Sequence, residues 1–121
     1  MFTIDHDAAT ATIRVVRSGS ADQAEAERYH AAMRDALSRA RGSGARFSVT
    51  IDISQAAPLP QDVAARFEQV AADMRRSSLH RVAFISSAAI NRLQAKRLTS
   101  GDPRFRTFAD AGAAEAWLAE P

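Results

Sequence analysis

The chain has 121 residues, of which 46% are hydrophobic and 25% charged, with a formal net charge of +2. This size fits one domain with a single core, and the composition is that of an ordinary globular protein. The chain has no cysteine, which excludes disulfides, thiolate metal sites and cysteine nucleophiles. The first residues lack a basic region and an apolar run, and no apolar stretch reaches the ~20 residues of a membrane span. We therefore expect a single cytoplasmic domain over residues 1–121.

Alternating apolar and polar residues near the N-terminus are typical of a β-hairpin. The alternation runs through residues 2–15 around a short polar turn and stops at 18–20. Ser20, with Gln23 three positions later, indicates a capping box at the start of a helix. Apolar residues at helical spacing carry this helix to a break at 42–44, so the sequence predicts a hairpin followed by a long amphipathic helix.

The clearest strand pattern covers residues 47–53, where apolar side chains occupy every second position. Such alternation indicates that one face of the strand packs against helices while the other is partly polar. Pro60 suits the first position of the following helix, whose apolar stripe includes Phe67 and Met74. Another short strand is predicted at 81–85.

The C-terminal third continues with the same kinds of element. Ser86 can cap a helix that begins at 88. Its apolar residues are Ile90, Leu93 and Leu98. A last strand at 104–108 leads through Asp110, a suitable cap, to a short helix whose Trp117 we expect in the core.

The predicted order of elements is thus ββαβαβαβα. Parallel strands need crossover connections, which the helical segments supply. We therefore expect an α/β fold with a mixed, mostly parallel five-stranded sheet, an N-terminal hairpin and four helices.

With this order the chain resembles SpoIIAA-like bacterial domains of the STAS/SEC14 type. Besides the hairpin, the segments that carry the likeness are VTIDIS (49–54), RVAFI (81–85), FRTFAD (105–110) and EAWL (115–118). The resemblance implies a small sheet whose helices pack mostly on one side. Similar anti-sigma-factor antagonists carry a phosphorylatable Ser or Thr at the start of the helix after the Asp-bearing strand, where free N–H groups receive the phosphate. Here residues 56–62 contain no hydroxyl, and Ser54, expected in the loop, is the nearest candidate.

Some polar side chains lie near the predicted carboxyl ends of strands, where open α/β sheets bind ligands. They are Asp52, Ser54, Ser86 and Ser87. Asp52 could organise an anion site or act as a base, or it could accept hydrogen bonds from the following turn. Ser86 and Ser87 could hold an anion at the start of a helix, or serve as an N-cap. No glycine-rich phosphate loop accompanies them.

Positive charge is concentrated in residues 75–106, which hold eight basic residues and one acid. Arg92, Lys96, Arg104 and Arg106 are candidate contacts for an acidic partner or an anion. The alternative is a solvated basic surface without a partner. Aromatic residues that could stack on bases are not interleaved with these side chains, so a nucleic-acid ligand is not expected.

The three histidines share no metal-ligand spacing and no nucleophile elbow is present, so we expect no metal, cofactor or catalytic residue. His30 is expected at the surface or its boundary. The sequence favours a non-catalytic regulatory or protein-interaction domain that contacts another protein or a second copy of itself, the latter through the hairpin edge. The alternative is a small-ligand or lipid-binding domain of the SEC14 type, with a pocket bordered by Phe67, Phe84 or Ile85.

Overall fold

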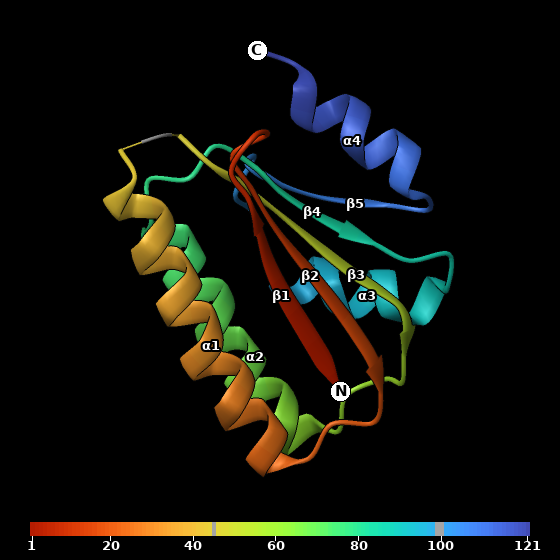
Figure 1. Ribbon diagram of the computed structural model, residues 1–121. Coiled ribbons are helices and arrows are strands. Elements are labelled where there is room, and N and C mark those ends of the chain that lie inside the picture. The colour runs from red at the N-terminus through yellow and green to blue at the C-terminus, as the bar shows by residue number, and fades with distance from the viewer. Residues whose placement is uncertain (45, 99–100) are drawn as a thin grey trace.

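Figure 1 shows the computed structural model, which describes residues 1–44, 46–98 and 101–121. The strands are β1 (Phe2–Asp7), β2 (Thr12–Gly19), β3 (Ser48–Ala56), β4 (Val82–Ile85) and β5 (Phe105–Phe108). The helices are α1 (Gln23–Gly42), α2 (Gln61–Arg76), α3 (Ala89–Leu98) and α4 (Ala111–Ala119). This is the predicted order of elements. Within the described ranges, none of the helices has the length and apolar character that crossing a membrane requires.

The strands form one sheet in the order β1-β2-β3-β4-β5. Only β1 and β2 pair antiparallel, which confirms the predicted mixed, mostly parallel sheet with an N-terminal hairpin. The β2 strand continues through its predicted break, with an irregularity in the register. Val16 pairs with Asp52 but Ser18 pairs with Gln55, so that Arg17 alone lies opposite two residues of β3. Such a bulge bends the pair locally and changes the direction of nearby side chains.

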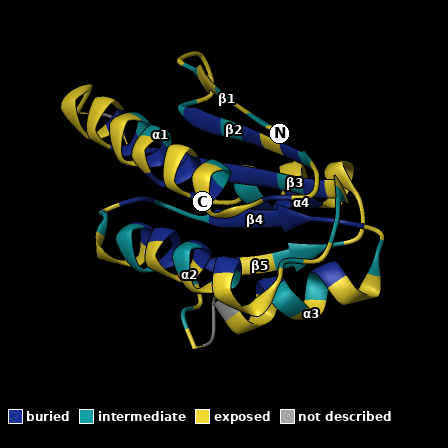
Figure 2. Cartoon of the chain, turned by 90° about the horizontal axis from the view of Figure 1, so that it is seen from below, coloured by how far each residue is buried: buried dark blue, intermediate teal, exposed yellow. Residues whose placement is uncertain are grey.

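Helices cover both faces of the sheet (Figures 1 and 2). The larger apolar cluster joins the sheet to α1, α2 and Ala95 of α3. A smaller cluster on the other face joins Ala83 and Ile85 of β4 to α4, whose Trp117 is 6% exposed, as expected for a core residue. The expectation that helices pack mostly on one side holds for three of the four. The α4 helix is the exception because β4 is apolar at every position, and its second face also needs a cover.

Short acidic side chains, rather than the predicted Ser20, begin the capped helices. The N-cap of α1 is Asp22, whose Oδ1 accepts a hydrogen bond from the backbone N–H of Glu25 at 2.8 Å. The predicted capping box is therefore wrong, because Ser20 lies two residues too early to reach the first turn. Asp110 caps α4 as expected, accepting from the N–H of Ala113 at 2.8 Å.

Candidate functional site

The structure does not bring the four predicted basic residues into one patch. Arg104 Nη2 binds Asp102 Oδ2 at 2.8 Å, and its guanidinium also donates to the carbonyls of Ser77 at 2.9 Å and Arg75 at 2.7 Å. The side-chain hydrogen bond from Arg104 holds the pKa of Asp102 below its usual range. Arg104 therefore provides hydrogen-bond donors to backbone carbonyls at the C-terminal end of α2.

Two further members of that set lie apart from each other. Arg106 is on the α4 face of the sheet, where its guanidinium lies 5.1 Å from the ring centroid of Trp117. Arg92, on the opposite face, turns back and donates from Nη1 to the carbonyl of Ser86 at 3.0 Å. The separation follows from strand alternation, which sends Arg106 and its neighbour Phe105 to opposite sides of β5.

The outward side of α3 carries exposed apolar groups next to positive charge. Ile90 is 53% exposed and Leu93 is 56% exposed. Exposed Arg97 follows Leu93 by four residues, with exposed Lys96 beside it. Positions 90, 93 and 97 lie on one side of a helix, and Figure 2 shows this side of α3 as mostly exposed. Hereafter Ile90, Leu93 and Arg97 are the outer face of α3.

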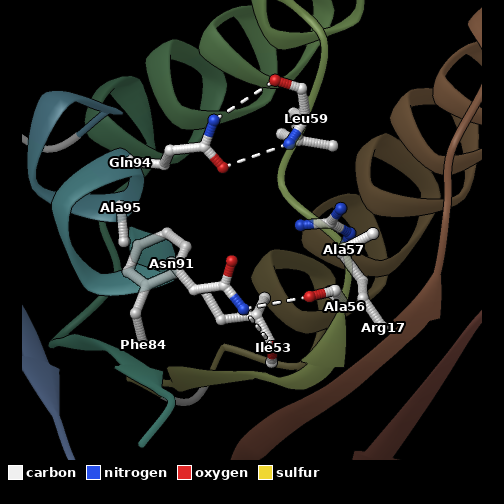
Figure 3. A pocket seen from close by; sticks show the side chains of 9 residues that line it. All are labelled: Arg17, Ile53, Ala56, Ala57, Leu59, Phe84, Asn91, Gln94 and Ala95. Atoms are coloured by element: carbon white, nitrogen blue, oxygen red, sulfur yellow. Dashed lines mark hydrogen bonds between the residues drawn. The ribbon is translucent and has the colours of Figure 1, made fainter. Parts of the chain in front are cut away.

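The inward side of α3 is held by amide groups (Figure 3). Buried Asn91 donates from Nδ2 to the carbonyls of Ile53 and Ala56, each at 3.0 Å. Gln94 accepts from the N–H of Leu59 at 3.1 Å and donates to the carbonyl of Leu59 at 3.2 Å. These bonds allow α3 to dock while its large residues Ile90 and Leu93 stay outside.

The predicted strand-end residues have local hydrogen-bonding roles. Half-buried Asp52 accepts from the N–H of Ser54 at 2.9 Å, a bond within β3 at the register shift and not one to the turn after the strand. Ser54 is exposed and lies within β3, because the strand extends beyond its predicted end. Ser86 is buried and its Oγ accepts from the N–H of Ala88 at 3.1 Å in the turn before α3; it is not the N-cap of that helix, which begins at Ala89, and Ser87 is exposed.

A pocket of about 20 Å³ lies between α3 and the carboxyl ends of β2 and β3 (Figure 3). Of the three residues predicted to border a pocket, Phe84 lines this one, whereas Phe67 and Ile85 do not. Arg17 is 8% exposed and directs its guanidinium into this space, and no described residue forms a hydrogen bond or ion pair with that side chain. The guanidinium carbon lies 4.2 Å from the ring centroid of Phe67. Burial lowers the pKa of Arg17 from its usual value.

Sequence reasoning missed Arg17, although a signal was present. The apolar alternation through Ile13 and Val15 continues to position 17 if the strand does not stop. A charged residue at the next inward position is then expected in the interior, where it needs a partner.

An ionic cluster around Asp73 joins α1 to α2. His30 Nε2 lies 2.7 Å from Asp73 Oδ2, and Arg34 Nε lies 3.3 Å from the same oxygen. Partial burial would raise the pKa of Asp73, but the hydrogen bonds from His30 and Arg34 outweigh it and lower the pKa. The expected surface position of His30 is wrong: it is 5% exposed, because it follows Ala26 by one helical turn on the buried stripe. Among the described residues, no three His, Asp or Glu side chains are grouped to hold a metal ion.

Comparison with known proteins supports the fold. No family model and no curated protein matches the sequence. The chain is similar in structure to an uncharacterized protein of the DUF3478 family, with a SpoIIAA-like fold, from Shewanella loihica PV-4. The TM-score is 0.68 at 18% sequence identity, and the alignment covers 98% of this chain and 92% of that one. The chain therefore has the SpoIIAA-like fold that its sequence suggested.

Proposed function

We propose that this SpoIIAA-like domain is a non-catalytic interaction module, and that it binds an acidic, amphipathic segment of another protein on the outer face of α3. The observation that carries the proposal is the adjacent exposure of Ile90 and Leu93, at 53% and 56%, on a helix without any acidic residue. Single exposed apolar residues are common on protein surfaces, but neighbouring ones on one helix face are typical of binding surfaces.

Charge complementarity favours an acidic partner. Arg97 lies beside Leu93 and also borders a groove of about 540 Å³ between α2 and α3. Within the described part of the chain no hydrogen bond or ion pair engages the Arg97 guanidinium. A partner helix could place its apolar side chains on Ile90 and Leu93 while its carboxylates approach Arg97, which is the helix-in-groove mode of recognition.

The candidate reactive groups form hydrogen bonds and ion pairs within the fold, which supports the proposal that the domain is not an enzyme. The Asp52 carboxylate accepts from the backbone of β3, the Ser86 hydroxyl accepts from the backbone of the turn before α3, and the His30–Asp73 pair is shared with arginines of α1 and α2. General acid–base or nucleophilic chemistry needs such groups facing a common space that a substrate can enter. These groups instead complete local structure.

Site-specific photo-crosslinking in the cell of origin tests the proposed face. A photoreactive residue at Leu93 should capture one partner protein, whereas the same residue at exposed Ala31 on α1 should not. Equal capture at both positions would contradict the proposal. Capture of a second copy of this chain at Leu93 would also contradict it, since it would indicate a homodimer through α3.

Affinity measurements with the captured partner then test the chemistry. Leu93→Asp and Arg97→Glu should each weaken binding at least about tenfold, with a stronger effect of Arg97→Glu at low salt. The matched control is Arg41→Glu, which makes the same charge change at the far end of α1. Both α3 variants should keep the melting midpoint, because the altered side chains are exposed. Unchanged affinity of Leu93→Asp would rule the face out.

A further inference from the structure

We propose that the protein forms a two-fold symmetric dimer in which β1 pairs antiparallel with β1 of a second copy, joining the two five-stranded sheets into one. The surface involved is the free edge of the sheet on the β1 side. It is separate from the outer face of α3 and does not depend on the function proposed for that face. In Figure 2, β1 lies along the border of the sheet, with α1 beside it and no described element beyond it.

Backbone groups of β1 are directed away from its only partner strand. Met1 and Ser18 exchange two hydrogen bonds, each at 2.9 Å, and the same register continues through β1 and β2. Because hydrogen-bonded pairs alternate along an antiparallel ladder, every second residue from Met1 bonds to β2. Phe2, Ile4 and His6 therefore direct their N–H and C=O groups to the open edge. These groups are available to another strand.

The side chains at this edge are incompletely covered. Phe2 and Ile4 are half-buried and pack against the larger apolar cluster, and the Phe2 ring centroid lies 5.3 Å from that of Tyr29. A hollow of about 200 Å³ between β1 and α1 is lined by Ile4, His6, Ala32, Asp35, Ala36 and Arg39. A strand added to β1 places its own inward side chains over this hollow and completes the cover of Phe2 and Ile4.

The two edges of the sheet differ in how far they are protected. β5 has four residues and is contacted by both α3 and α4. Short and covered edge strands are common protection against unwanted pairing. β1 has six residues, contains no proline, and pairs with β2 without a bulge. Of the two edges, the one at β1 is therefore the one open to another strand.

The sequence of β1 is complementary to itself in one antiparallel register. A two-fold axis at Ile4 places Ile4 opposite Ile4 of the second copy, and Phe2 opposite His6. All the residues with free backbone groups then exchange hydrogen bonds with the second copy. On the other face of the sheet, exposed Thr3 lies opposite exposed Asp5, and its hydroxyl can donate to that carboxylate.

Neighbouring registers fit less well. An axis at Asp5 sets two carboxylates directly opposite each other, which is destabilising. An axis at Thr3 pairs Phe2 with Ile4 but leaves His6 without a partner. The register centred on Ile4 has no like charges directly opposite and uses the full edge, so a second copy of this chain is the matching occupant. A two-fold pairing uses the same surface on both copies and therefore ends at a dimer.

Sedimentation equilibrium tests the dimer. His6→Pro removes one edge N–H but leaves the bonds between β1 and β2, so it should weaken dimerisation at least about tenfold. His6→Ala keeps that N–H and should remain a dimer, as should Leu93→Asp, which alters only the outer face of α3. Circular dichroism should show the same fold for every variant. A monomeric mass of the unaltered protein at ~100 μM, or equal association of His6→Pro and His6→Ala, would overturn the proposal.

Disulfide cross-linking tests the register without relying on proline. The chain has no cysteine, so single-cysteine variants have no competing thiol. A mixture of Thr3→Cys and Asp5→Cys should form the mixed disulfide, identified by its mass, because such non-hydrogen-bonded partners have Cα atoms about 4.5 Å apart. Either variant alone should cross-link far less. Stronger cross-linking of Asp5→Cys with itself would overturn the proposed pairing, as would a mixture no more reactive than Arg41→Cys, at an exposed position of α1.

Discussion

Helices α2 and α3 cover the same face of the sheet but are held there in opposite ways. The inward residues of α2 are Val63, Phe67, Val70, Ala71 and Met74. Those of α3 include Asn91 and Ala95, whereas Ile90 and Leu93 face solvent. One helix is docked mainly by apolar burial, and the other by amide hydrogen bonds to strand carbonyls and to a loop.

This difference shows that the apolar residues of a helix do not by themselves identify its buried side. A polar side chain can face the interior when its donors meet carbonyls there, because the bonds offset the cost of removing it from water. The apolar residues are then available on the outside. In this molecule the same helix has a hydrogen-bonded inner side above the Arg17 pocket and an exposed outer side, where we propose that a partner binds.

The largest expected effect comes from truncation on α2. Phe67→Ala should lower the free energy of unfolding by ~3–5 kcal/mol, because it removes a buried ring that contacts Tyr29 and Arg17. Leu93→Ala is the matched control on α3 and should change stability by no more than about 0.5 kcal/mol. Denaturant unfolding monitored by circular dichroism measures both. Equal losses for the two variants would remove the contrast between the helices.

A smaller effect is expected at the amide anchor of α3. Asn91→Ala leaves the carbonyls of Ile53 and Ala56 without their side-chain donor and should cost ~1–3 kcal/mol. Faster hydrogen exchange in α3 than in α2 would show that the loss is local to this helix. Ser87→Ala, an exposed change before α3, serves as the control. A cost for Asn91→Ala no greater than that of the control would mean that α3 is held by other contacts.

The smallest effect concerns the ionic link between α1 and α2, and it depends on pH. The pKa of Asp73 is lowered in the folded protein, so the stabilisation is present above the ordinary carboxyl pKa of 3.8 and is lost as pH falls through the lower folded value. The protein should therefore lose stability at acid pH more steeply than Asp73→Asn does. Melting midpoints between neutral and strongly acid pH measure the difference. Parallel curves for the two proteins would show that Asp73 does not contribute.

The candidate sites were less predictable than the fold. Arg92 and Lys96 were expected in one patch with Arg104 and Arg106, but Arg104 binds backbone carbonyls of α2 and Arg106 lies against α4. Proximity along the chain does not indicate which acceptors a long side chain will reach. The position of Arg17 depended on whether β2 continued beyond residue 15, where the predicted alternation ended, and pairing with β3 extends the strand there.

The likeness to SpoIIAA-like domains indicated the fold, and the sequence by itself determined the order of elements and the mixed sheet. These follow from the two-residue and 3.6-residue periodicities of apolar side chains, which are properties of short segments such as 47–53. Only the tertiary structure decided that α4 covers the second face, that α3 presents Ile90 and Leu93 to solvent, and that the Arg17 side chain is largely buried without a hydrogen bond or ion pair to any described residue. The reason is physical: burial and hydrogen-bond satisfaction depend on groups distant in sequence, and the strands bring those groups together only when the sheet has formed.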